Sequence, residues 1–154
     1  MLNTVSAACN RPHHPAATLA FRVEVGGKKI AYVSDNEFLF GHLGPPQAIG
    51  PDSAALVHHR PLVDFLAGCD LLVGEAQYLN EEYGGKVGWG HSSVGNACAL
   101  AKLAAVKRWI VIHHDPLHDD EFLDKKLNLT KSVLRSLDWP IEVRHGYDGM
   151  VEFI

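Results

Sequence analysis

The 154-residue sequence lacks both a long apolar run and a large excess of charge of either sign. No stretch approaches the roughly 18 consecutive apolar residues that a membrane-spanning helix needs, so we expect no membrane span. The first residues show no basic segment followed by an apolar one, and they therefore give no support for a secretory signal. Lys and Arg total 14 against 18 Asp and Glu, a formal net charge of −4. This balance argues against a long nucleic acid as the partner.

Cysteine is also scarce, with only Cys9, Cys69 and Cys98. An odd number at wide spacing does not suit a disulfide framework, and it predicts reduced thiols in a cytoplasmic protein. The apolar content of 47%, without repeats or low-complexity segments, predicts a single globular domain over residues 1–154. What the sequence has in excess is histidine, with ten residues.

Hydrophobic periodicity predicts strands and helices that alternate in one α/β domain. Residues 18–25 and 28–34 alternate around a Gly-Gly pair, which predicts a β-hairpin. The short apolar runs at residues 70–73 and 109–112 predict strands buried on both faces and joined by a parallel crossover. The other expected elements are an N-terminal edge strand, helices over residues 54–67, 92–105 and 119–137, and closing strands over residues 141–144 and 150–154.

Candidate ligands stand directly after the buried strands or at the start of a helix. Asp35 follows the second hairpin strand, His113 follows the strand at residues 109–112, and His91 precedes a helix. The mouths of strands are where α/β domains gather ligands, and carboxylate with imidazole there can hold zinc, manganese or iron. Each residue taken alone also fits a plainer role as a turn former or helix cap.

The remaining histidines and the loop aromatics give weaker indications. His58 and His59 fall in a predicted amphipathic helix and are interpreted as part of its solvated face, and His145 has no informative context. The long polar segment at residues 75–90 exceeds a simple connector, which is typical of functional loops. Its aromatic residues suit either the walls of a planar ligand or a cover for the sheet edge: Tyr78, Tyr83 and Trp89.

Two strings resemble the C-terminal half of metallo-β-lactamase-fold metal-dependent hydrolases, on their phosphodiesterase and ribonuclease Z side. They are KVGWGHSS at residues 86–93 and HHDPLHDD at residues 113–120, and AYVSDNE at 31–37 and LLVGEAQY at 71–78 agree with them. The resemblance runs from about residue 13 to the end. It implies an α/β fold of mixed sheets with flanking helices, equivalent to half of an αββα sandwich.

The resemblance also implies roles for individual residues. Asp35 matches the aspartate that bridges two metals, His113 matches the last histidine ligand, and His91 matches a catalytic proton donor or charge stabiliser beside the scissile phosphate. The implied cofactor is a divalent metal, with zinc or manganese first and iron third, and the implied mechanism is attack by metal-bound hydroxide. Three further histidines keep open roles: His14, which matches a position near the rim of the site, His114 and His118.

One departure from the family is large. The signature His-x-His-x-Asp-His, which supplies most ligands of both metals, is absent from the 154 residues. A dinuclear site needs about seven protein ligands, so Asp35 and His113 alone would leave the metals mostly bound to water. Glu75 stands where the family more often has aspartate.

Three hypotheses of function follow. The first is a metal-dependent hydrolase of phosphodiester type, whose site is completed by another polypeptide and whose substrate is a small phosphoester or nucleotide-like molecule. The second is a catalytically incomplete half-domain that acts as a binding or assembly module, for which a homodimer is expected because an unpaired apolar sheet face favours self-association. The third is an independent α/β binding domain with only architectural similarity to the hydrolases.

Overall fold

The computed structural model describes residues 5–8 and 14–154, whose strands form one mixed sheet. The first three strands pair antiparallel, and each strand from the third to the sixth lies parallel to its neighbour. This arrangement confirms the expected α/β class, with a single sheet in the part that is described. In their order across the sheet, the strands are β1 (Val5–Ala8), β2 (Ala20–Val25), β3 (Lys28–Val33), β4 (Leu71–Glu75), β5 (Arg108–Ile112) and β6 (Glu142–His145).

The two longest helices begin at residues whose side chains accept hydrogen bonds from free backbone amides. Ser93 Oγ accepts a hydrogen bond from Asn96 N, and an Asp119 carboxylate oxygen accepts one from Phe122 N. The helix expected over residues 54–67 is divided, because Pro61 lacks an amide donor and fits only the first turn of a helix. The helical elements are η1 (Pro46–Ala48), η2 (Ala54–Leu56), α1 (Arg60–Leu66), α2 (Asn80–Tyr83), α3 (Val94–Leu103) and α4 (Asp120–Ser136).

The hydrophobic core lies between the sheet and its helices. Ala31, Leu72, Trp109 and Val143 come from four neighbouring strands and are all buried in this layer. The Trp109 indole Nε1 also donates a hydrogen bond of 3.1 Å to the Gly74 carbonyl. α3 is almost entirely buried, and its many small side chains allow close approach to the sheet.

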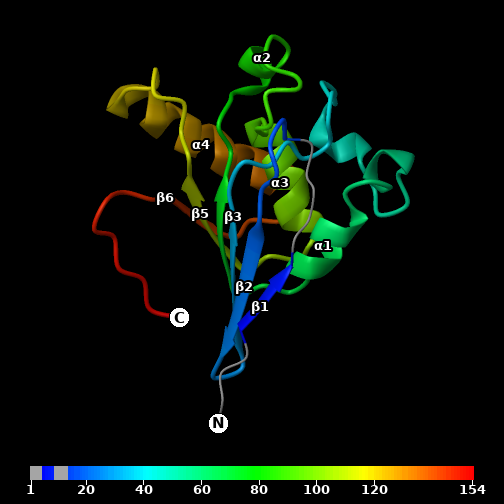
Figure 1. The fold of residues 1–154 in the computed structure, drawn as a ribbon. Coiled ribbons are helices and arrows are strands. Elements are labelled where there is room, and N and C mark those ends of the chain that lie inside the picture. Colours follow the sequence, from blue (N-terminus) through cyan, green and yellow to red (C-terminus); the bar gives the residue numbers. More distant parts are fainter. Residues whose placement is uncertain (1–4, 9–13) are drawn as a thin grey trace.

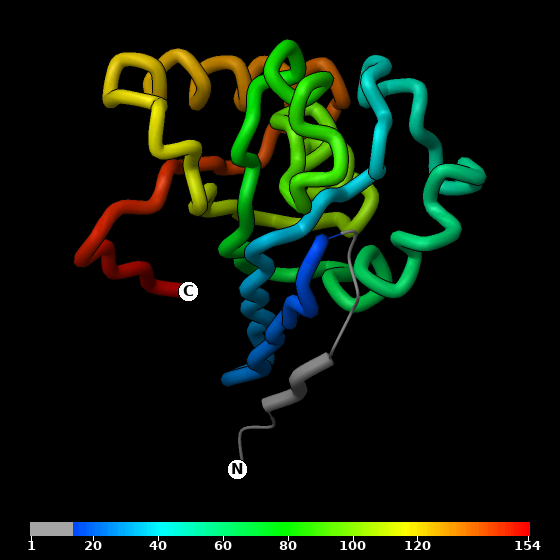
Figure 2. Tube along the Cα trace, turned by 45° about the horizontal axis from the view of Figure 1, so that its top comes forward, coloured from blue at the N-terminus to red at the C-terminus, as the bar shows by residue number. Residues whose placement is uncertain are grey.

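The opposite face of the sheet carries apolar side chains that none of the helices in residues 14–154 covers. Phe21 is 41% exposed and Tyr32, its partner on β3, is 45% exposed. The alternation predicted for residues 18–25 is therefore present, but its apolar side lies on the uncovered face. α1 and the C-terminal segment lie on opposite sides of the sheet in both views (Figure 1) (Figure 2).

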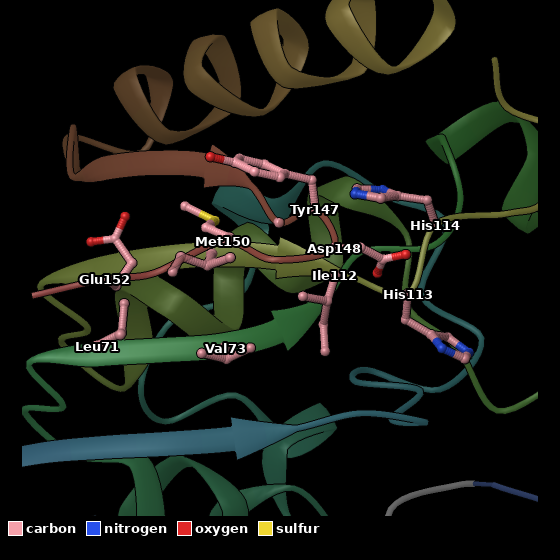
Figure 3. A pocket seen from close by; sticks show the side chains of 11 residues that line it. Leu71, Val73, Ile112, His113, His114, Tyr147, Asp148, Met150 and Glu152 are labelled. Carbon is pink, nitrogen blue, oxygen red and sulfur yellow. The ribbon is translucent and has the colours of Figure 1, made fainter. Parts of the chain in front are cut away.

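The C-terminal segment lies beside this open face and forms one wall of a pocket of about 410 Å³. Leu71 and Val73 of β4 and Ile112 of β5 line the pocket together with Met150 (Figure 3). The closing strand predicted over residues 150–154 is wrong, since this segment contributes to the pocket and forms no ladder with β6.

Two further expectations concern cysteines and membrane spans. Cys69 and Cys98 are buried and unpaired, as predicted, while Cys9 lies outside the described residues. Burial raises the pKa of the Cys69 thiol to about 11, which makes this thiol a poor nucleophile. Over the described ranges, no helix has the length and apolar character needed to cross a bilayer.

Candidate metal-binding and hydrolytic site

Acidic and imidazole side chains meet at the carboxyl edge of three adjacent parallel strands. Asp35 follows β3, Glu75 ends β4 and His113 follows β5. His113 Nε2 lies 3.3 Å from Asp35 Oδ1, and both side chains are more than a third exposed. The parallel order of the strands therefore brings together the two residues predicted as metal ligands, which are 78 positions apart by subtraction of their numbers.

The backbone at both strand ends adopts a left-handed conformation. Asp35 has a φ of 49° and His113 a φ of 57°. Asp and His tolerate this region better than most residues, yet it still costs on the order of 1 kcal/mol at each position. Ser34 Oγ fixes the Asp35 carboxylate further by donating a 2.8 Å hydrogen bond to its Oδ2. Asp35 and His113 are thus positioned by left-handed turns after β3 and β5, and strand propensity alone does not predict such turns.

His91 is oriented by a buried carboxylate. Its Nδ1 lies 3.0 Å from Glu75 Oε1, and the Glu75 side chain is 1% exposed. Glu75 also accepts hydrogen bonds from Asn36 N, at 2.6 Å, and from Ser92 N, at 3.2 Å. Because an ionised carboxylate can only accept, Nδ1 of His91 must donate, which leaves Nε2 for other contacts. Glu75 was not predicted as a site residue, although, like Asp35, it stands at the end of a strand of the sheet.

The charges around His91 favour its protonated form. Burial alone would lower the pKa of the imidazole, but the Glu75 hydrogen bond and charge, aided by Asp35 and Glu37, raise the pKa above its usual 6.5. Asp35 Oδ1 lies 4.0 Å from His91 Nδ1. The arrangement thus favours the protonated imidazole, which is the form that a general acid requires.

His14 completes the group of side chains. Its ring centroid lies 5.5 Å from that of His91, and the donor atoms of His14, Asp35 and His91 all lie within 4.8 Å of one another. The close approach depends on Gly90, where a Cβ atom would come within 2.1 Å of the His14 ring. His91, predicted as a proton donor, thus also belongs to a set of donors that could hold a metal.

A second polar cluster lies between α4 and the ends of β5 and β6. Lys126 is 1% exposed, and its Nζ donates 2.7 Å to the Gln77 carbonyl and lies 3.5 Å from His114 Nδ1. The rings of His114 and His145 are 4.3 Å apart. Burial lowers the pKa of Lys126 to about 8, against the opposing attraction of nearby carboxylates. His145, which has no informative context in the sequence, is therefore part of an internal network, as is His118, whose Nε2 lies 3.0 Å from Glu82.

We expect this cluster to make the protein acid-sensitive through His145. Burial, with Lys126 as the next cause, lowers its pKa from 6.5 to about 4. The unfolded chain then binds more protons between those values, so stability present above pH 6.5 is lost as the pH falls toward 4. The contribution of His145 to the slope of unfolding free energy against pH is at most about 1.4 kcal/mol per pH unit.

Urea unfolding of the wild type and of His145→Phe, at several pH values across that interval, measures the effect. The phenylalanine ring can still pack on His114 but takes up no proton, so its unfolding free energy should fall less steeply with acid. His58→Gln is the control, because His58 is exposed. Equal slopes for His145→Phe and the wild type would contradict the assignment.

Several weaker interpretations from the sequence are corrected by burial. His59 is 4% exposed, and its Nε2 accepts from Phe40 N at 3.4 Å, so it does not belong to a solvated face. Tyr78 and Tyr83 are 3% and 1% exposed, which excludes them as walls of an open ligand site. Trp89 is 56% exposed and therefore remains a candidate for the wall of a site that binds a planar ligand.

Comparisons with known proteins place this arrangement in a structural context. No family model matches the sequence. The sequence is 34% identical over 77 residues to ribonuclease Z of Shouchella clausii (strain KSM-K16), an alignment that covers 48% of this chain and 25% of that protein. Human tRNase Z, short form, is similar in structure with a TM-score of 0.57 and 21% identity, over 96% of this chain and 42% of that one.

A second solved structure agrees. The metallo-β-lactamase fold protein YhfI from Bacillus subtilis has a TM-score of 0.61 and 18% identity, over 96% of this chain and 48% of YhfI. The chain thus spans about half the length of the solved proteins it matches. These findings confirm the resemblance predicted from the sequence strings: the chain has the metallo-β-lactamase fold over the part of those proteins that it matches.

Proposed function

We propose that this chain carries one part of the active site of a metal-dependent hydrolase that cleaves phosphodiester bonds. The observation that supports the proposal is the meeting of Asp35, His91 and His113 at the ends of adjacent parallel strands, with Glu75 behind His91. These are a carboxylate and two imidazoles in partly exposed positions, which follow β3 and β5 and precede α3. Such a constellation suits hydrolysis better than simple ligand binding, because His91 has both a carboxylate partner and a free ring nitrogen.

The donor set fits a divalent metal. Asp35 and His113 would hold it, and neutral imidazole with carboxylate is the combination that zinc and manganese accept. When bound, the metal would supply Lewis-acid activation of a water molecule. The short distance between His113 Nε2 and Asp35 Oδ1, 3.3 Å, means that the two donors already face one another. With so few ligands, the affinity of this chain alone should be modest.

His91 is proposed to act on the leaving group. Glu75 holds Nδ1, so Nε2 is the atom that can deliver a proton to a departing oxygen. The negative charge of Glu75 also stabilises the imidazolium form, and burial of the Glu75 side chain keeps water from weakening that interaction. After proton delivery, His91 would be neutral and ready to take up another proton from solvent.

The site is proposed to be completed by a further polypeptide segment. The chain covers less than half of each solved relative, and its uncovered sheet face carries partly exposed apolar residues such as Phe21 and Tyr32. A partner with an apolar sheet face of its own would bury these residues. We propose a cytoplasmic location, in accord with the free cysteines.

The proposed substrate is a small phosphoester or nucleotide-like molecule. The formal net charge of −4 supplies no broad attraction for a polynucleotide. Two matched proteins carry the names ribonuclease Z and tRNase Z, so an RNA substrate is the alternative that an experiment must include.

A second candidate function is supported by the open sheet face. A half-domain with this face uncovered could act as a catalytically incomplete binding or assembly module, paired with a second copy of itself. Light scattering coupled to size-exclusion chromatography distinguishes the two: a stable dimer that neither retains metal nor hydrolyses phosphodiesters supports the module.

The hydrolase proposal is tested on the purified 154-residue chain. We expect zinc or manganese to bind measurably by titration calorimetry, and bis(p-nitrophenyl) phosphate to be hydrolysed above the rate of free metal. A structured RNA is assayed beside it to separate the two substrate classes. Absence of both metal binding and hydrolysis would refute the proposal for this chain.

A further inference from the structure

Glu37 is a fully buried carboxylate close to the candidate site but outside its set of possible ligands. It lies in the turn after β3 and is 0% exposed. An isolated charge in such a place is very unfavourable, so its hydrogen-bond partners must compensate. All of the partners found for it belong to a single stretch of chain, residues 83–90, which leads directly into His91.

The carboxylate holds that stretch at its beginning and at its end. Tyr83 Oη donates 2.7 Å to Oε1, Gly88 N donates 2.8 Å to the same oxygen, and Gly90 N donates 2.9 Å to Oε2. The Tyr83 hydroxyl in turn accepts from Gly41 N at 2.9 Å. The two amides therefore converge on one side chain from alternate residues of the loop.

The loop also makes local turns, in which Lys86 N donates to the Tyr83 carbonyl and Trp89 N to the Lys86 carbonyl. Gly88 is exposed, and both glycines adopt left-handed backbone conformations, with φ of 85° at Gly88 and 92° at Gly90. Glycine is conformationally free in this region, so the sequence by itself does not determine the path of the loop. The hydrogen bonds to Glu37 hold the loop on the N-terminal side of His91, whose Nδ1 lies 3.0 Å from Glu75 Oε1.

We propose that Glu37 is a positioning residue for His91. It does not touch His91, but it anchors Gly88 and Gly90 so that the imidazole keeps its hydrogen bond to Glu75 and faces Asp35. The catalytic consequence rests on the proposed hydrolase function, whereas the effect on the position of His91 does not. Loss of Glu37 would thus lower the turnover rate and leave substrate binding largely unchanged.

The test compares Glu37→Gln with Tyr83→Phe. Glutamine keeps the size of the side chain but replaces one acceptor oxygen by an NH2 group. This group is a donor that would face a glycine N–H, so one hydrogen bond to the loop is lost. Phenylalanine removes one donor to Glu37 and leaves both glycine bonds. For bis(p-nitrophenyl) phosphate, we expect Glu37→Gln to lower kcat by about 10–100-fold with little change in KM, and Tyr83→Phe to change kcat by less than about threefold.

A second readout does not depend on activity. The ring N–H proton of His91, bonded to the buried Glu75 carboxylate, should give a protected downfield NMR signal, assigned by its loss in His91→Gln. We expect this signal in the wild type and in Tyr83→Phe, and its loss in Glu37→Gln. If the wild type neither binds metal nor hydrolyses the phosphodiester, the proposed function fails, and the NMR signal still decides the positioning role.

Retention of the signal in Glu37→Gln would overturn the inference. Equal stability loss in both variants with an unchanged kcat would do the same, because it would make Glu37 a purely structural residue. Should Glu37→Gln not fold, Glu37→Asp replaces it: the charge remains, but the carboxylate is withdrawn by one methylene. We then expect a weakened His91 signal, and an unchanged one would contradict the proposal.

Discussion

Replacing Asp35 by asparagine is expected to lower the zinc or manganese affinity of the chain by more than about 100-fold, beyond the 10–100-fold typical for loss of an outer-shell partner. The amide is neutral and nearly the same size, so it removes the negative charge that faces His113 Nε2 at 3.3 Å. It should keep the left-handed turn, since Asn tolerates a φ of 49° as well as Asp does. Titration calorimetry with each metal gives the affinity, and the same samples give the hydrolysis rate.

The matched control for Asp35→Asn is Asp64→Asn, at an exposed aspartate on α1 that does not belong to the group of candidate ligands. It makes the same chemical change with no expected effect on metal binding. If Asp35→Asn binds metal as well as the control, Asp35 is not a ligand. The assignment of the metal site to the ends of β3 and β5 would then be wrong, whatever the activity of the chain.

Replacing Trp109 by alanine should cost about 3–5 kcal/mol of unfolding free energy, a large part of the 5–15 kcal/mol typical of a domain. Trp109 is 1% exposed on the helix-covered face of β5 and is the largest side chain in the core. The substitution leaves a cavity between β4, β5 and α3, and it also removes the hydrogen bond to the Gly74 carbonyl. Urea denaturation followed by circular dichroism measures the change.

Two companion variants make this result interpretable. Trp89→Ala removes the same side chain from a position that is 56% exposed, and its cost should stay within about 0.5 kcal/mol. Trp109→Phe keeps most of the volume and should lie between the two, which gives a measurement even if the alanine variant does not fold. A loss below about 1 kcal/mol for Trp109→Ala would show that the core does not depend on this residue.

The positions of Asp35, His91 and His113 were predictable because each follows a buried strand or begins a capped helix. Their distances were not, since the 3.3 Å approach of Asp35 to His113 depends on strand order and on left-handed turns at both residues. The role of Glu37 was even harder to predict from the sequence. Its role depends on backbone amides of Gly88 and Gly90, and no side-chain pattern records such partners.

The alternation in β2 shows a different limit. It correctly separated apolar Phe21 from Arg22, but the usual rule places apolar residues on the covered side. Here Arg22 lies on the helix side, where it donates 2.7 Å to the Phe65 carbonyl, and Phe21 is 41% exposed. A pattern of period two identifies the two faces of a strand, and only the tertiary structure shows which of them a neighbour covers.

The unequal covering of the two sheet faces has a consequence for biosynthesis. Because the helix-covered layer is built from this chain alone, we expect the polypeptide to reach its native topology without waiting for a partner. The open face would then be the surface that the partner segment proposed above covers. Until it is covered, Phe21 and Tyr32 remain accessible to non-specific contacts, so we expect co-expression with that proposed partner to favour a soluble product.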